Sequence, residues 1–366
     1  MVDPYVAKMA RVLVQYSLGL KPGDLFRIIA PPAAVPLVSE LYRAALEAGA
    51  HPYLALTLEE TEELLYRHGS DEQIGLITPM MRQEIEEIHA SIRIMASENT
   101  RALSGIDPQK VAIRRQALRH VQERVMQRSA EGTLNWCVTL FPTNAAAQDA
   151  DMSLREFEEF VYRACKLHYD DPVAEWRRTS AEQQRIADVL NGCATIRILS
   201  PDTDLTYRVA GRTWINCAGD RNFPDGEVFS SCDETATEGH IRYTFPAIYA
   251  GREVEDVRLW FEHGQVVRAT AARGEDLLHS LLNMDDGARR LGEVAFGTNY
   301  EITRFTRNIL FDEKIGGTVH LALGAGYPET GSRNTSALHW DMICDMRQGE
   351  VYADGRMIYK DGKFVI

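Results

Sequence analysis

The chain has 366 residues, which is more than one hydrophobic core usually holds, so we expect two domains. Its 45% hydrophobic and 25% charged residues are typical of a soluble globular protein and argue against a disordered or low-complexity chain. The formal net charge of −13 argues against a nucleic-acid partner, because binding to phosphates favours a basic surface.

The first half of the sequence alternates helical and strand-like segments. Apolar positions at helical spacing predict helices over residues 4–18, 35–48, 72–89 and 108–127. Short apolar runs bounded by turn residues predict strands over residues 25–30, 51–56, 91–96 and 134–140. Because strand–helix–strand order is typical of parallel sheets, we expect an open α/β domain over residues 1–180. No G-x-G-x-x-G sequence follows the first strand and no Walker sequence occurs, so nothing indicates nucleotide binding.

The second half, residues 181–366, consists mainly of short segments of alternating polarity. They predict strands over residues 194–198, 206–209, 214–216, 251–261, 265–270, 318–323, 337–344, 350–352, 356–360 and 363–365. Helical spacing predicts helices over residues 275–282 and 285–295. Asp354-Gly355 and Asp361-Gly362 predict tight hairpins between the last strands. We therefore expect an α+β domain that is rich in antiparallel strands.

The cysteines and the first residues bear on the compartment. The six cysteines are scattered and form no C-x-x-C pair, which is typical of buried thiols in a reducing environment. The N-terminus has no basic segment followed by an apolar one, and no apolar stretch approaches the ~20 residues that span a membrane. We expect a cytoplasmic protein without membrane partners.

Acidic residues and histidines collect in the last third of the chain. They are Glu227 after a Pro-Asp-Gly turn, Glu293 in a predicted helix, Glu313 after Phe-Asp, His320, and the His339-Trp340-Asp341 segment. Carboxylates and imidazoles are ligands that Zn, Mn, Co and Fe accept. Taken singly, Glu227 could be a turn acid, Glu293 a solvated helix carboxylate and His320 a structural histidine. Taken together, these residues indicate a metal site.

His339 and Asp341 form the sharpest pair. Residues i and i+2 of a strand share one face, so both side chains can reach one ion. The flanking Leu338, Trp340 and Met342 indicate that this strand is buried. A buried histidine and aspartate without partners would be costly, so the two are either metal ligands or hydrogen-bonded to each other.

Several segments give the chain a resemblance to a known family. They are Asn222-Phe223-Pro224-Asp225-Gly226-Glu227, Gly292-Glu293, Phe311-Asp312-Glu313, His320-Leu321-Ala322-Leu323-Gly324, Tyr327-Pro328 and His339-Trp340-Asp341-Met342. The sequence resembles the thermophilic-type metallo-aminopeptidase family along nearly its whole length.

The resemblance implies a homodimer that uses two divalent metal ions to remove N-terminal amino acids from peptides. The ions could be Zn, Co, Mn or Mg. It implies that the metal ligands are Glu227, Glu293, Glu313, His320, His339 and Asp341. It also implies that Glu293 lies between the metals and that Tyr327 lies at the reaction centre, so these two are the expected catalytic residues. The seven-residue step from Glu313 to His320 is longer than in the family, which leaves two alternatives open, one ion or two.

The expected chemistry is hydrolysis of the N-terminal peptide bond. Two divalent ions about 3.5–4 Å apart can hold both a nucleophilic water and the scissile carbonyl group. Glu293 would take up the proton of the water, and Tyr327 would donate a hydrogen bond to the developing oxyanion. The surrounding carboxylates would favour the free α-ammonium group of a peptide, which suits an aminopeptidase.

One alternative keeps the scaffold and changes the reaction. His320, His339 and Asp341 alone make the two-His, one-carboxylate set of non-haem Fe(II) oxygenases, so a ring-cleaving dioxygenase is the competing prediction. Glu227 and Glu293 favour the hydrolase, because an iron triad does not need them. A metal-binding protein without catalysis is a third possibility, which Tyr327 argues against.

Overall fold

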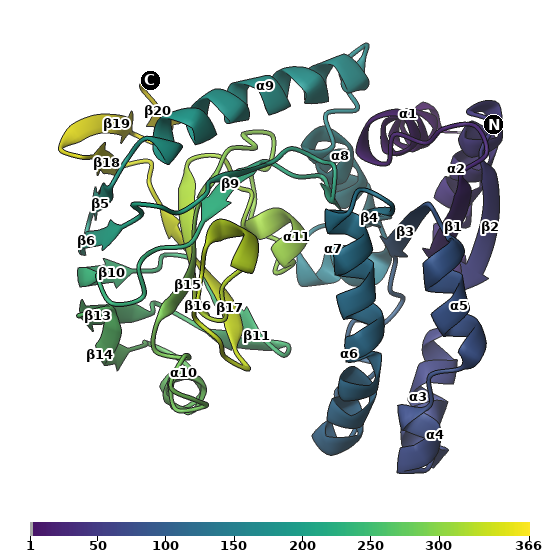
Figure 1. The fold of residues 1–366 in the computed structure, drawn as a ribbon, viewed down its shortest axis with the longest axis horizontal. Coiled ribbons are helices and arrows are strands. Elements are labelled where there is room, and N and C mark those ends of the chain that lie inside the picture. The colour runs from purple at the N-terminus through teal and green to yellow at the C-terminus, as the bar shows by residue number, and fades with distance from the viewer. Residues whose placement is uncertain (1–2) are drawn as a thin grey trace. The chain divides into compact units, whose positions relative to one another are not determined.

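Figure 1 shows a computed structural model of the protein, which describes residues 3–366. The chain divides into two compact units. The first contains the chain up to Glu175 together with Gly219–Phe223, and the second contains Trp176–Ala218 and Pro224–Ile366. The predicted combination of an α/β part and an α+β part is confirmed. The expected domain boundary after residue 180 lies inside helix α9 (Pro172–Asn191) and stays a prediction.

The first unit is built on a parallel sheet with the strand order β2-β1-β3-β4-β8. The strands are β1 (Leu25–Ala30), β2 (His51–Leu56), β3 (Ala90–Met95), β4 (Asn135–Leu140) and β8 (Asn222–Phe223). The helices are α1 (Pro4–Val12), α2 (Val35–Glu47), α3 (Glu59–His68), α4 (Asp71–Gly75), α5 (Pro79–Glu87), α6 (Pro108–Ala130), α7 (Asn144–Asp149) and α8 (Leu154–Ala164). All four strands predicted for this half of the sequence agree with the structure to within one residue.

The single helix predicted over residues 72–89 is wrong, because the segment forms two helices, α4 and α5. Thr78 lies between them with an extended backbone, as expected for a residue that precedes a proline. Its hydroxyl oxygen accepts a hydrogen bond of 3.2 Å from the N–H of Met81 and so caps α5. Pro79 and this cap define the start of a new helix.

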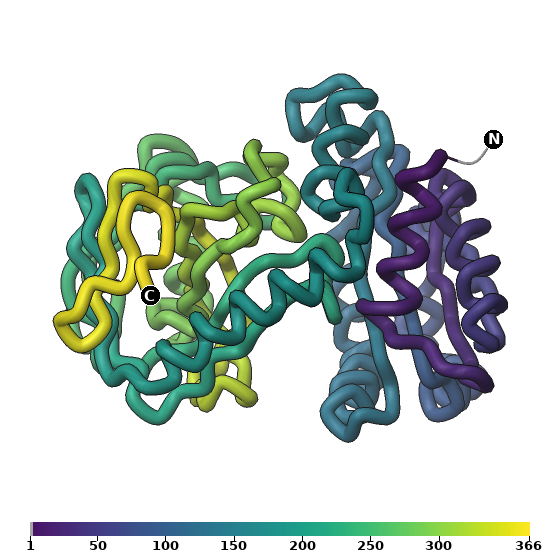
Figure 2. Tube along the Cα trace, turned by 90° about the horizontal axis from the view of Figure 1, so that it is seen from above, coloured from purple at the N-terminus to yellow at the C-terminus, as the bar shows by residue number. Residues whose placement is uncertain are grey.

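The second unit contains two larger antiparallel sheets. One has eight strands in the order β14-β13-β10-β6-β5-β18-β19-β20, and the other has five in the order β17-β16-β15-β9-β7. The eight are β5 (Thr195–Ser200), β6 (Thr203–Arg208), β10 (Glu238–Arg242), β13 (Arg258–Glu262), β14 (Gln265–Thr270), β18 (Glu350–Ala353), β19 (Arg356–Lys360) and β20 (Lys363–Phe364). The five are β7 (Ile215–Cys217), β9 (Glu227–Ser230), β15 (Leu291–Gly297), β16 (Thr318–Gly324) and β17 (His339–Asp345). In Figure 2 the C-terminal strands, in yellow, return to the teal strands that follow α9, in agreement with the pairing of β18 and β5.

One hydrophobic core joins the two sheets of the second unit. Its buried side chains include Ile198 and Leu205 from the eight-stranded sheet and Val319, Leu321 and Leu323 from the five-stranded sheet. Because side chains alternate along a strand, the residues between those of β16 lie on the opposite face of the five-stranded sheet. The face that looks away from this core therefore carries the polar residues of the predicted metal site.

The helix predicted over residues 285–295 is wrong, because the segment forms a turn followed by strand β15. The carboxylate of Asp285 accepts hydrogen bonds from the N–H groups of Gly287 (3.0 Å) and Ala288 (2.9 Å), which fixes the turn. Every residue of β15 is buried. The strand forms through pairing with β16 and β9, which are distant in sequence, and this pairing overrides the local helical pattern.

The strand predicted over residues 251–261 is wrong as a single element. It is divided into β12 (Arg252–Val254), which pairs with β11 (Ala247–Tyr249), and β13 of the eight-stranded sheet. Between them, Asp256 has a positive φ of 53° and interrupts the extended backbone. The other helices of this unit are α10 (Glu275–Leu282), which agrees with its prediction, and α11 (Ile309–Asp312). No helix within residues 3–366 is long and apolar enough to cross a membrane.

Candidate metal centre

Four neighbouring strands of the five-stranded sheet carry five of the predicted ligands. Glu293 lies on β15, His320 on β16, His339 and Asp341 on β17, and Glu227 at the start of β9. The pairing register places Asp341 opposite Ala322 and Glu227 opposite Gly297, so small residues separate the polar side chains across the sheet. All five belong to the face that looks away from the core.

A β-bulge sets the direction of Glu293. The pairing of β15 with β16 shifts between Leu291, which belongs to the core, and Glu293. In a regular strand these two residues would share a face, but the extra residue, Gly292, changes the alternation. A Cβ atom at Gly292 would lie 2.3 Å from the carbonyl oxygens of Gly324 and Ala325, so only glycine fits there. The Gly-Glu pair of the sequence is thus the device that places this carboxylate among the histidines.

The side chains of the five residues converge. Glu293 Oε1 lies 3.4 Å from His320 Nε2, and Glu293 Oε2 lies 3.4 Å from His339 Nε2, so its two oxygens face different histidines. His320 Nε2 is also 3.3 Å from Glu227 Oε2. His339 Nε2 is 3.4 Å from Asp341 Oδ2. The carboxylate of Glu293 therefore joins the two halves of the cluster.

Glu313, the sixth predicted ligand, also reaches the cluster. It follows α11, and one of its oxygens lies within 4.8 Å of ligand atoms of His320 and Asp341. The chain then turns back into β16 through Gly316, where a Cβ atom would lie 2.6 Å from the ring of Tyr300. This tight turn accommodates the long step to His320 without moving Glu313 away. The sequence alone left the position of this carboxylate open.

Three overlapping groups of side chains have the spacing of a metal site. They are Glu227, Glu293 and His320; Glu293, His339 and Asp341; and Glu313, His320 and Asp341. Each histidine is grouped with carboxylates. Among residues 3–366, no group combines both histidines with Asp341. The arrangement thus resembles two adjoining carboxylate–histidine sites more than one two-histidine triad.

The cluster is buried and incompletely hydrogen-bonded. His320 is fully buried, and Glu227 and Glu293 are 6% and 5% exposed. Glu227 Oε2, both ring nitrogens of His320 and Asp341 Oδ1 have no hydrogen-bond partner within residues 3–366. Each buried polar atom without a partner costs about 1–3 kcal/mol. Divalent cations would satisfy Glu227 Oε2, His320 Nε2 and Asp341 Oδ1, so the residues present fit the metal that their types predict.

Mutual contact shifts the protonation of the cluster. Burial alone would lower the pKa of His320 and His339, but close contact with negatively charged carboxylates, Glu293 among them, raises these values to about 9 and about 11. Burial would raise the pKa of Glu293, but the two histidines outweigh it and lower this pKa to about 2. In the metal-free protein both histidines are therefore in the doubly protonated, positively charged form at neutral pH. A metal ion would have to displace these protons when it binds.

His339 is oriented by the backbone. Its Nδ1 lies 2.7 Å from the carbonyl oxygen of Ala325. With Nδ1–H donating to this carbonyl, Nε2 is left free to bind an ion, as is usual for metal-binding histidines.

Tyr327, the predicted catalytic tyrosine, lies beside the cluster. Its ring packs edge-on against the rings of His339 (5.3 Å between centroids) and Phe229 (5.5 Å). Partial burial and the neighbouring carboxylates of Glu293 and Asp341 raise the pKa of its hydroxyl, which keeps its proton. The hydroxyl is therefore available as a hydrogen-bond donor.

Lys314 is a residue of the cluster that the sequence analysis did not identify. Its side chain is fully buried, and its Nζ contacts Glu227 Oε1 at 3.4 Å and donates a hydrogen bond to Glu313 Oε1. Lysine is almost never fully buried unless it is paired. The only signal in the sequence was its place directly after Glu313 and before an apolar Ile-Gly-Gly segment.

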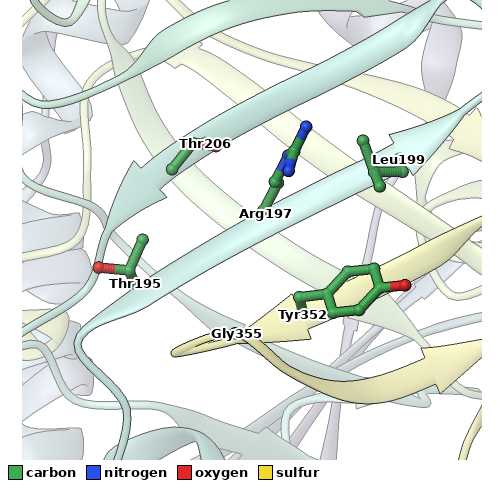
Figure 3. Close-up of a pocket in the computed structure, with 6 residues that line it drawn as sticks. All are labelled: Thr195, Arg197, Leu199, Thr206, Tyr352 and Gly355. Carbon is green, nitrogen blue, oxygen red and sulfur yellow. The ribbon is translucent and has the colours of Figure 1, made fainter.

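A groove elsewhere in the second unit has no such chemistry. It has a volume of about 440 Å³ and lies on the eight-stranded sheet, lined by Thr195, Arg197, Leu199, Thr206, Tyr352 and Gly355 (Figure 3). Arg197, the charged residue of this groove, donates hydrogen bonds of 2.8 and 2.7 Å to Asp204. None of the lining residues belongs to the metal-binding groups.

Comparison with known proteins agrees with the chemistry of the cluster. Residues 2–364 match the model of the thermophilic metalloprotease (M29) family. Aminopeptidase 2 of Geobacillus stearothermophilus is 30% identical, and the match covers 97% of this chain and 94% of that protein. Aminopeptidase T of Thermus thermophilus is 27% identical, with 97% and 95% covered.

Two solved structures share the fold. Wild-type AmpT from Thermus thermophilus superposes with a TM-score of 0.86 at 24% identity and 99% coverage of both chains. The 2,5-dihydroxypyridine dioxygenase from Pseudomonas putida KT2440 superposes with a TM-score of 0.62 at 13% identity, with 100% of this chain and 98% of that chain covered. At these identities each likeness supports the fold alone.

Proposed function

The chain belongs to the thermophilic metalloprotease (M29) family and is a metal-dependent aminopeptidase, and we propose that the cluster on its five-stranded sheet is the catalytic metal centre. One observation carries this proposal. The two oxygens of Glu293 face the two histidines separately, and buried ligand atoms around them have no hydrogen-bond partner in the described part of the chain, residues 3–366. This is the arrangement expected of a carboxylate that bridges two ions.

We assign the ligands in two sets. Glu227, Glu313 and His320 would hold one ion, and His339 and Asp341 the other, with Glu293 shared between them. The support is that Glu227, Glu293 and His320 form one group within 4.8 Å, and that Glu293, His339 and Asp341 form another. Glu313 is grouped with His320, and also with Asp341 of the other set. When bound, such ions polarise the scissile carbonyl group and supply an activated water. Zn, Co and Mn accept both carboxylate and imidazole ligands, Mg would use the carboxylates, and the choice among the four stays a proposal.

Two residues would take part in the chemistry beside the ions. Glu293 is buried between the two histidines, where its carboxylate would accept a proton during cleavage of the peptide bond. Tyr327 keeps its hydroxyl proton and lies against His339, so it can donate a hydrogen bond to the oxygen on which negative charge develops.

The dioxygenase alternative has support from the fold alone. An iron triad would bring His320, His339 and Asp341 around one ion, whereas among residues 3–366 no group combines both histidines with Asp341. The buried Glu227 and Glu293 have no function in such a triad. The geometry therefore favours hydrolysis.

One experiment separates the two reactions. The protein is stripped of metal and supplied separately with Zn, Co, Mn, Mg or Fe, and two activities are measured, release of leucine from leucyl-amide and oxygen consumption on 2,5-dihydroxypyridine. We expect amide hydrolysis with at least one metal and no oxygen consumption. Oxygen consumption with Fe and no hydrolysis with any metal would overturn the assignment.

We also propose that the protein is a cytoplasmic homodimer. The dimer is supported by the family resemblance, and the compartment by six cysteines that are scattered along the sequence with no C-x-x-C pair. Analytical ultracentrifugation of the purified protein would test the dimer. Cell fractionation would test the compartment.

A further inference from the structure

Lys314 is fixed at the inner side of the metal centre. Its backbone N–H donates to the carbonyl oxygen of Phe311 (3.0 Å), and its own carbonyl oxygen accepts from the N–H of Asn299 (3.0 Å). Its side chain is fully buried, so the ammonium group is not exposed to solvent. The position of Nζ is therefore set by the fold and by the carboxylates around it.

The ammonium group of Lys314 uses carboxylates that the proposed metal ion also needs. Glu227 shows this division at the level of single atoms. Its Oε1 lies 3.4 Å from Lys314 Nζ, whereas its Oε2 lies 3.3 Å from His320 Nε2 and has no hydrogen-bond partner within residues 3–366. Glu313 gives one oxygen to Lys314 and also lies in a group with His320. The lysine therefore contacts the same two side chains, Glu227 and Glu313, that the proposed metal ion would bind.

The charge of Lys314 is maintained in this place. Its ammonium group contacts the carboxylates of Glu227 and Glu313, and these negative charges favour the charged form of the lysine. A permanent positive charge that shares two carboxylates with a divalent cation must repel that cation, because little water lies between them.

We propose that Lys314 is a positioning residue that holds Glu227 and Glu313 in place and weakens the binding of the metal ion that these carboxylates share with it. This inference rests on the proposed metal centre and adds a function for a residue outside the ligand set. When no ion is bound, the ammonium group of Lys314 balances part of the negative charge of Glu227 and Glu313. When an ion is bound, Lys314 would still share these two carboxylates, so they would neutralise less of the charge of the ion.

The test measures metal affinity, which does not depend on catalysis. Full-length protein is freed of metal, and Zn binding is measured by competition with a chromogenic chelator. Lys314→Met keeps the length of the side chain and removes its charge, and Lys314→Arg keeps the charge. The control is Lys360→Met, because Lys360 also pairs with a glutamate (Nζ to Glu350 Oε1, 3.3 Å) but lies on the eight-stranded sheet.

We expect Lys314→Met to bind its tightest Zn ion at least about tenfold more tightly than the unchanged protein, because a repelling charge has been removed. Lys314→Arg and Lys360→Met should bind Zn as the unchanged protein does. The metal-free Lys314→Met protein should also melt at a lower temperature, and added Zn should raise its melting temperature more than that of the unchanged protein.

If Lys314→Met does not fold without metal, the protein is prepared with Zn, and release of Zn into excess chelator is followed. Slower release than from the unchanged protein supports the inference. Unchanged or weaker Zn binding by Lys314→Met, or equal or faster release, overturns it. If the unchanged protein binds no Zn or other divalent ion, the proposed metal centre itself is wrong, so the two failures are distinguishable.

Discussion

The substitution Glu293→Gln tests the centre most directly, because it removes one charge and almost no volume. Glu293 is 5% exposed, and its oxygens lie 3.4 Å from a nitrogen of each histidine. Glutamine fills the same space, so the packing of β15 should be unchanged. It cannot accept a proton as a carboxylate does, and its amide nitrogen cannot bind a cation.

The expected loss of activity follows from these two deficits. A positioned general base typically contributes 10²–10⁴-fold to the rate, so we expect kcat for leucyl-p-nitroanilide to fall by at least about 10²-fold. In the metal-free protein both histidines lose the negative charge of Glu293, which should lower the free energy of unfolding by about 1–3 kcal/mol. Both effects should appear with the secondary structure intact.

The assay combines steady-state kinetics, metal content and circular dichroism. Metal content, measured by mass spectrometry with saturating metal, separates loss of the ion from loss of the base. The matched control is Glu40→Gln, since Glu40 is also 5% exposed and pairs with Arg43 on α2, outside the cluster. Full activity in Glu293→Gln would refute the proposed role, and equal losses in both variants would point to a general effect of substituting buried carboxylates.

Three further outcomes are expected. Tyr327→Phe should lower kcat by about 10²-fold with metal content unchanged, because one oxyanion donor is lost; an unchanged kcat would remove Tyr327 from the mechanism. Gly292→Ala should lower the free energy of unfolding by about 3 kcal/mol or more in chemical denaturation, because its Cβ would lie 2.3 Å from two carbonyl oxygens. The third outcome concerns pH and the metal-free protein. His320 and His339 have pKa values raised to about 9 and about 11, so their contribution is complete below about pH 6.5 and is lost as pH rises through 9 to 11. The pKa of Glu293 is lowered to about 2, so its contribution is present above pH 4.5 and is lost only as pH falls through 2. Denaturation of the metal-free protein should therefore show stability falling between pH 6.5 and 11, and a rise over this range would contradict the assigned contacts.

Local sequence patterns predicted the first unit well, and physical reasons explain where they succeeded. The strands over residues 25–30 and 51–56 are apolar runs with turn residues at both ends, and these signals lie within the segment itself. The prediction of a single helix over residues 72–89 was wrong, although Thr78 and Pro79 are a local signal for the start of a new helix. Strand β8 could not have been predicted, because Asn222–Phe223 forms it only by pairing with β4, far away in the sequence.

The candidate site shows the same limit. All six predicted ligands meet in space, and the shared face of His339 and Asp341 follows from the two-residue period of a strand. The strand that carries Glu293 was predicted as a helix, because its pairing partners and its bulge are not local features. The position of Lys314 was also beyond sequence reasoning, because a buried lysine depends on carboxylates brought in by the fold.

The placement of the ligands on four strands has a consequence for the lifetime of the protein. The ligands lie on strands that are far apart in the sequence: Glu227, Glu293, His320 and Asp341. Bringing them together closes long loops of the chain, which costs entropy, so the site is complete only when the sheet has formed. A metal ion held there would act as a cross-link that binds the folded form and not the unfolded one. At a metal concentration about 1,000-fold above Kd this linkage adds about 4 kcal/mol to the free energy of unfolding. Metal supply would thus govern how long the second unit resists proteolysis, as well as whether it cleaves peptides.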